Sequence, residues 1–114
     1  MKRHGVPIEL FGNLKGMFGA NEGSAIGVVN AAKETKRKIV IIGFDSGKQQ
    51  KAAITSGEMA GAITQNPVGI GYKTVEAAVK ALKGEKLPKV IDTGFMWYDK
   101  TNITDPKIVA VLYD

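Results

Sequence analysis

Three polar side chains able to form several hydrogen bonds recur along the chain, each just after a short apolar run. They are Asn21, Asp45 and Gln65. A carboxylate accepts hydrogen bonds from two adjacent hydroxyl groups, and each side-chain amide offers both donor and acceptor atoms. These groups are therefore suited to bind a neutral, hydroxyl-rich molecule. An analogue that lacks a hydroxyl would leave one of them unpaired, which gives specificity.

Each of these residues also has a simpler structural interpretation. Asp45 or its neighbour Ser46 would be a suitable helix N-cap, and Asn21 would close an Asx turn. For any one position taken alone, the structural role is favoured. A polar side chain of this type after each of three successive apolar runs, however, favours a ligand-binding role for the three together. Two amides and one carboxylate provide neither an activated nucleophile nor a second acid that shares a proton, so we predict no enzymatic activity.

The composition argues against several other kinds of site. The chain has no cysteine and one histidine, His4, which excludes disulfides and thiolate metal sites and makes a zinc site or a catalytic triad hard to build. We therefore predict no metal and no cofactor. The net charge is +5, and its densest cluster is Lys33, Lys36, Arg37 and Lys38. This cluster falls where a helix should end, a position that favours cations, so we predict no nucleic-acid partner.

The elements that position these residues alternate along the chain. Apolar runs predict strands at 14–20, 38–44 and 60–64, and periodic segments predict helices at 24–36, 48–56 and 68–83. This alternation predicts right-handed crossovers and a parallel sheet, in which ligands bind beyond the carboxyl ends of the strands. An extended segment is expected at 90–98, and a further edge strand at 107–113.

The helix at 68–83 has the clearest amphipathic pattern of the chain. Its apolar residues follow a spacing of four, three, four and three: Val68, Tyr72, Val75, Val79 and Leu82. Exposing such a stripe to water forfeits about 1.5–3 kcal/mol for each large side chain. We therefore expect this helix either to dock on its own sheet or to be exchanged with a second copy of the chain.

Three segments of the chain resemble successive motifs of a known family. They are 20–27 (ANEGSAIG), 41–45 (IIGFD) and 63–67 (ITQNP), and 79–85 (VKALKGE) is similar to the helix end that follows them. The family is that of the sugar-binding proteins of bacterial ABC transporters, of the ribose-binding type. The resemblance covers residues 14–104, whereas 1–13 match no motif. Many ribose binders have an Asn-Asp pair where this chain has Asn21-Glu22, which leaves the sugar open.

The resemblance implies a fold and a division of the chain. The fold would be α/β, a three-layer parallel-sheet lobe that forms half of a type I periplasmic binding protein and is truncated here. Residues 1–66 would belong to the C-terminal lobe, 67–89 to a helix of the other lobe, and 90–114 to a returning extended segment. Asn21, Asp45 and Gln65 would correspond to ligands of the sugar hydroxyls.

The resemblance also implies a function and partners. The parent protein would bind a monosaccharide, a pentose or a similar sugar, and deliver it to a membrane permease. It would be periplasmic or extracellular, including a lipid-anchored form, although this chain shows no signal peptide. We expect the fragment to bind weakly or not at all, and to be a homo-oligomer or to lack an N-terminal lobe. The alternative is the effector-binding lobe of a lac-repressor-type transcription regulator, which would need an upstream helix-turn-helix.

Overall fold

The computed structural model describes residues 11–114, so the predictions for His4 and the rest of the first ten residues lie outside the described part. The described elements alternate as the sequence predicts. In chain order they are β1 (Gly16–Phe18), α1 (Glu22–Glu34), β2 (Val40–Phe44), α2 (Lys48–Ser56), β3 (Gly61–Gln65), α3 (Pro67–Leu82), β4 (Phe95–Tyr98) and α4 (Pro106–Val109). The three predicted strands and the three predicted helices are confirmed, with shifts of a few residues at their ends.

The four strands form one sheet in the order β1-β2-β3-β4. The first three strands are parallel, and β4 runs antiparallel to β3. Ala62 of β3 lies opposite both Gly43 of β2 and Tyr98 of β4. The prediction of a mostly parallel α/β unit is therefore confirmed.

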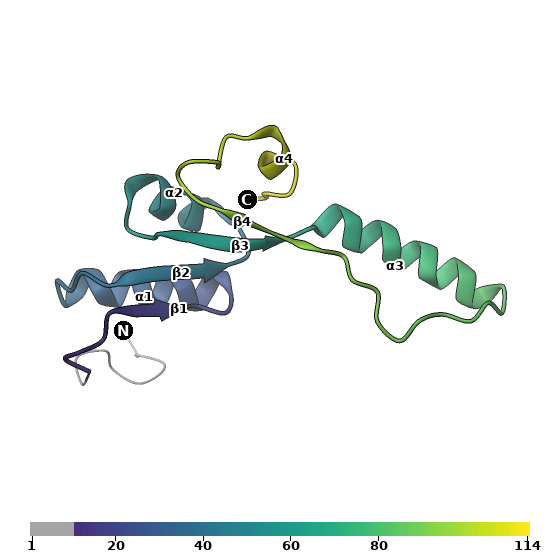
Figure 1. Ribbon diagram of the computed structural model, residues 1–114, viewed down its shortest axis with the longest axis horizontal. Coiled ribbons are helices and arrows are strands. Elements are labelled where there is room, and N and C mark those ends of the chain that lie inside the picture. The colour runs from purple at the N-terminus through teal and green to yellow at the C-terminus, as the bar shows by residue number, and fades with distance from the viewer. Residues whose placement is uncertain (1–10) are drawn as a thin grey trace.

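The two faces of this sheet differ in how they are covered. Both α1 and α2 lie on the face that contains Ile41 and Ala62, where they contact one another and bury the core (Figure 1). Right-handed crossovers between strands in sequential order place helices on one face in this way. The opposite face carries exposed apolar side chains, with Phe18 at 55%, Val40 at 56% and Trp97 at 41%. The described residues thus make two layers of the expected three-layer lobe.

Helix α3 projects from this body as an arm (Figure 1). It begins at Pro67, after the cap residue Asn66, whose Oδ1 accepts from the Gly69 N–H at 3.0 Å. None of its residues is buried, and the exposed fractions of its apolar stripe run from 44% at Val79 to 89% at Leu82. The expectation that the helix docks on its own sheet is therefore wrong. Its exchange with a second copy stays a prediction.

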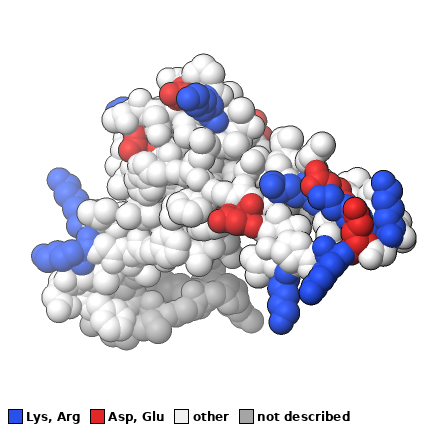
Figure 2. Space-filling model, turned by 45° about the vertical axis from the view of Figure 1, so that its right-hand side comes forward, with Lys and Arg blue, Asp and Glu red and all other residues white. Residues whose placement is uncertain are grey.

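Charged side chains of both signs cover the projecting end of the molecule (Figure 2). On α3, Lys80 pairs with Glu76 at 3.3 Å, one helical turn away. The arm thus has a charged side and an apolar side, as expected of a helix that packs along one stripe. No helix within residues 11–114 is both long and apolar enough to traverse a bilayer.

The C-terminal segment corrects one prediction. The edge strand expected at 107–113 is wrong, because a short helix, α4, stands there instead. Asp105 accepts from the Lys107 N–H at 2.8 Å and Pro106 occupies the first turn, both of which favour a helix start. The segment then returns over the core. Ile108 is buried, and the Tyr113 N–H donates to the Ser46 hydroxyl at 2.8 Å.

Candidate functional site

The carboxyl ends of β1, β2 and β3 lie at one edge of the sheet, because the three strands are adjacent and parallel. Asn21 follows β1 at the start of α1, Asp45 is the first residue after β2, and Gln65 is the last residue of β3. The structure therefore places all three predicted residues along this edge, one from each of three neighbouring strands.

Asn21 has a structural role that uses one half of its amide. Its Oδ1 accepts from the Ser24 N–H at 2.8 Å and from the Ser24 hydroxyl at 2.9 Å, which makes it the N-cap of α1 in a capping box. The structural role of Asn21 is therefore a helix cap and not the Asx turn that the sequence suggests. The cap uses the amide oxygen, so the Nδ2 donors are left for a ligand at the exposed edge.

Asp45 is held by its main chain and not by its carboxylate. Its φ of 72° lies in the left-handed region, which residues other than glycine rarely adopt, although aspartate does so more often than most. Its N–H donates to the Ile63 carbonyl at 2.7 Å. The N-cap of α2 is Gly47, so the alternative that Asp45 or Ser46 caps this helix is wrong. The side chain of Asp45 is half-buried and is not used as a helix cap.

Gln65 lies at the junction between the body and the arm. It is exposed and lies opposite Phe95 of β4, and the next residue, Asn66, caps α3. A side chain at this position reaches the edge from the last parallel strand. It is also the last residue of the body before the chain enters α3.

Two buried polar residues behind the edge were not assigned to the site from the sequence. The Gln50 Nε2 donates to the Asp45 carbonyl at 2.5 Å and to the Tyr98 hydroxyl at 3.0 Å, and the Tyr98 hydroxyl donates to the same carbonyl at 2.8 Å. Burial raises the pKa of Tyr98 to about 12, and the hydrogen bond from Gln50 partly opposes this. The available signal was periodicity: Gln50 shares a helix face with Ala53 and Ile54, which predicts burial.

Glu22 adds a second carboxylate at the same edge. It is the first residue of α1, and a Cβ on Gly47 would collide with its carboxylate. The side chain therefore lies across the gap between the start of α1 and the start of α2. This contact needs glycine at position 47.

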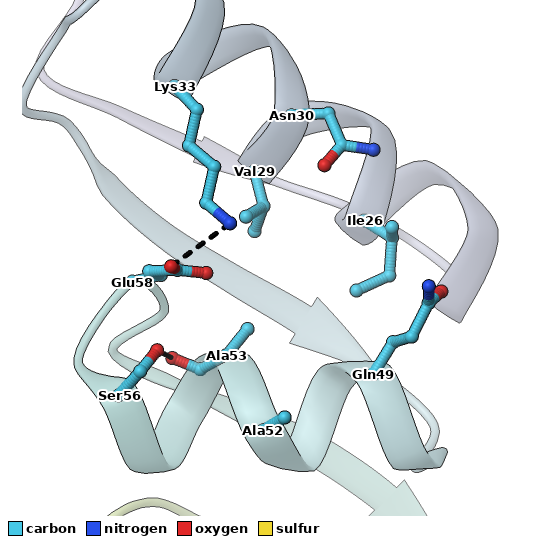
Figure 3. A pocket seen from close by; sticks show the side chains of 9 residues that line it. All are labelled: Ile26, Val29, Asn30, Lys33, Gln49, Ala52, Ala53, Ser56 and Glu58. Atoms are coloured by element: carbon cyan, nitrogen blue, oxygen red, sulfur yellow. Dashed lines mark hydrogen bonds and ion pairs between the residues drawn. The ribbon is translucent and has the colours of Figure 1, made fainter.

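A separate hollow of about 350 Å³ lies between α1 and α2 (Figure 3). The ion pair between Lys33 and Glu58, 3.0 Å long, crosses it, and Asn30 and Gln49 add polar groups. None of the three predicted ligand residues lines this hollow. Within the described residues, no group of three or more His, Asp or Glu side chains could hold a metal ion.

Comparison with known proteins assigns the family. A family model described as periplasmic binding protein domain matches residues 9–86. The chain belongs to this family. The ribose import binding protein RbsB of Haemophilus influenzae is 40% identical over 76 residues, which are 67% of this chain and 26% of that protein.

Solved structures of the same family share the fold. A solute-binding protein of an ABC transporter from Agrobacterium vitis, with bound D-fucose, has a TM-score of 0.82 at 37% sequence identity. The matched region covers 93% of this chain and 37% of the Agrobacterium vitis chain. A protein of Brachyspira murdochii is described as "ABC transporter, LacI family transcriptional regulator" and has a TM-score of 0.78 at 41% sequence identity. The matched region covers 87% of this chain and 35% of the Brachyspira murdochii chain. The chain thus spans 26% to 37% of the length of these three proteins.

Proposed function

We propose that the chain is part of a solute-binding protein that captures a monosaccharide for an ABC transporter, and that Asn21, Asp45 and Gln65 bind the sugar hydroxyls. The observation that carries this proposal is the alignment of the three residues along one edge, each from a different parallel strand. Relatives named for ribose import and for bound D-fucose support a sugar of this size.

The chemistry of the edge suits a neutral polyol. The Asp45 carboxylate accepts from two neighbouring hydroxyls, the Asn21 Nδ2 donates to a hydroxyl oxygen, and Gln65 does either. Hydrogen bonds to a charged acceptor are stronger than neutral ones, so Asp45 contributes most to affinity. A pentose or a similar sugar has adjacent hydroxyls in the arrangement that such an acceptor needs.

The exposed arm supports a second lobe in the parent protein. No residue of α3 is buried, and its apolar stripe finds no partner on the described body. In the proposed division, residues 1–66 form a lobe, 67–89 pack on the other lobe, and 90–114 return to the first. Light scattering tests the alternative of a homo-oligomer: a monomeric chain excludes exchange of α3 between copies.

Membership of this family supports a cellular localisation and a protein partner for the parent protein. Its members are periplasmic, so we assign the parent protein to the periplasm or the cell exterior, including a lipid-anchored form. Its partner would be the membrane permease that receives the sugar. One lobe alone encloses the sugar on one side only, so we expect the 114-residue chain to bind weakly.

An NMR titration of the ¹⁵N-labelled chain with D-ribose, and then with a panel of pentoses and hexoses, tests the proposal. We expect saturable shifts at the side-chain amides of Asn21 and Gln65 and at the Asp45 N–H. Asp45→Asn should weaken binding roughly tenfold, because a charged acceptor is lost. Asp92→Asn is the matched control, since that carboxylate accepts from the Gly94 N–H in an exposed loop. Shifts that avoid the edge, or equal affinities of Asp45→Asn and Asp92→Asn, would contradict the proposal.

The second candidate is the effector-binding lobe of a lac-repressor-type regulator. The name of the Brachyspira murdochii structure favours it, since it includes both functions. The two candidates differ in the segment that precedes the lobe. Mass spectrometry and N-terminal sequencing of the native protein distinguish them: a helix-turn-helix segment supports regulation, and a native protein without one supports transport.

A further inference from the structure

The main chain of Asp45 is held by the two strands that bracket the arm. Its N–H donates to the Ile63 carbonyl of β3 at 2.7 Å, and its carbonyl accepts from the Tyr98 hydroxyl of β4 at 2.8 Å. The chain leaves the body through β3 and returns through β4. Both polar groups of the Asp45 backbone therefore depend on the strands that connect the body to α3.

The left-handed backbone of Asp45 requires such support. Aspartate tolerates a φ of 72° better than most residues with a side chain, but this conformation still costs energy that the surrounding contacts offset. The Asp45 carbonyl accepts two side-chain donors, the Tyr98 hydroxyl and the Gln50 Nε2. Without them the Asp45 backbone would gain access to the ordinary right-handed and extended regions, which would change the position of its carboxylate.

The two donors have little freedom to move. Gln50 and Tyr98 are each 0% exposed. The other amide atom of Gln50, Oε1, is buried without a hydrogen-bond partner in the described residues, and a Cβ on Gly43 would lie 2.6 Å from it. Buried polar atoms are seldom left unpaired. Here the amide oxygen is left unpaired among the residues described, while the Nε2 donates to the Tyr98 hydroxyl and to the carbonyls of Asp45 and Phe44.

We propose that Tyr98 is a positioning residue for Asp45: its hydroxyl fixes the Asp45 backbone and so couples the sugar-binding carboxylate to the placement of β4. The inference rests on the proposed role of Asp45 as a sugar ligand. It implies that any movement of α3 that displaces β4 weakens the binding of the sugar by Asp45. The body and the arm are thereby linked through one buried hydroxyl.

The first experiment needs no sugar. Tyr98→Phe removes only the hydroxyl, and Tyr72→Phe, on a side chain that is 72% exposed on α3, is the matched control. We expect amide hydrogen exchange at Asp45 to become at least about tenfold faster in Tyr98→Phe, the factor for one lost net hydrogen bond. Exchange elsewhere in the sheet and in Tyr72→Phe should stay unchanged. Unchanged protection of Asp45 in folded Tyr98→Phe would overturn the proposal.

A second variant guards against failure of Tyr98→Phe to fold. Gln50→Met keeps the length of the side chain and removes the other donor to Asp45. It should also accelerate exchange at Asp45, with the Tyr98 hydroxyl still in place. Slow exchange at Asp45 in this variant would overturn the claim that side-chain donors hold its backbone.

The final experiment is a double-mutant cycle on D-ribose binding, followed by NMR. Tyr98→Phe should weaken binding roughly five- to tenfold in the wild-type and Asn21→Ala backgrounds, and by a smaller factor in Asp45→Asn, where the side chain that it positions binds less tightly. Equal effects in all three backgrounds would show a general structural role and overturn the proposal. If the sugar-dependent shifts of the wild-type chain avoid the edge, the proposed function fails, and the exchange experiments still decide whether Tyr98 positions Asp45.

Discussion

The body and the arm both contain amphipathic helices, but these helices differ in their packing. Helix α1 buries Ala25, Val29 and Ala32 against the sheet, whereas α3, with a clearer apolar stripe, buries nothing. Apolar periodicity predicts which face of a helix is to be covered, but not by what. In the body the covering surface lies in the same chain, whereas no described residue covers the stripe of the arm. The following predictions compare matched positions in the two regions.

The largest difference is expected for apolar truncations. Ile54 on α2 is 1% exposed and Leu82 on α3 is 89% exposed. Ile54→Ala should lower the free energy of unfolding by about 2–5 kcal/mol, because it leaves a cavity, whereas Leu82→Ala should leave it within about 0.5 kcal/mol. Urea denaturation followed by circular dichroism measures both. Equal losses would show that α3 is packed in solution.

The next prediction concerns alkaline stability of the body. Burial raises the pKa of Tyr98 to about 12 from the usual 10.0. Below pH 10 both the folded and the unfolded states keep the proton, so this group leaves stability unchanged. Between pH 10 and 12 the unfolded state loses the proton first, so stability should fall with rising pH. Denaturation at a series of pH values should show a shallower fall in Tyr98→Phe. Tyr72→Phe on the arm should retain the wild-type slope.

A smaller contrast is expected at the two asparagine caps. Asn21 caps α1 and Asn66 caps α3, each through its Oδ1. Asn21→Ala should lower the global free energy of unfolding by about 1 kcal/mol. Asn66→Ala should shorten α3 without moving the urea midpoint of the body, because α3 buries no residue against it. Amide exchange along both helices checks this, and a shift of the midpoint in Asn66→Ala would show that arm and body unfold together.

The smallest contrast uses two glycines. A Cβ at Gly27 in α1 or at Gly71 in α3 would meet no atom within 4 Å. Alanine should stabilise either helix by about 0.5–1 kcal/mol. In Gly27→Ala this gain should appear in global unfolding, and in Gly71→Ala only in the helicity of α3. A global gain in Gly71→Ala would contradict the independence of the arm.

Much of the fold could be predicted from the sequence because its elements are locally encoded. The β-branched block 38–44 and the helix pattern after it fix a strand and a crossover, and strand order then brings Asn21, Asp45 and Gln65 to one edge. The end of the chain was predicted wrongly because its apolar run is compatible with a strand. The start signal at Asp105 and Pro106 outweighs that run.

The support behind the edge could not be predicted in the same way. Gln50 and Tyr98 are 48 residues apart, and their contact depends on the antiparallel register of β4, which no local pattern specifies. The left-handed backbone of Asp45 is equally hidden, because aspartate adopts several conformations after a strand. The role of the three edge residues as sugar ligands stays a prediction.

The register of β3 and β4 brings the two ends of the arm together. Gln65, where the chain leaves the body, lies directly opposite Phe95, where it re-enters. Residues 66–94 are therefore an insertion whose two ends already touch, and a two-residue turn between these partners would close β3 and β4 into a hairpin. A shortened chain of this kind should keep every strand of the sheet, and the same junction should accept a foreign segment in place of the helix.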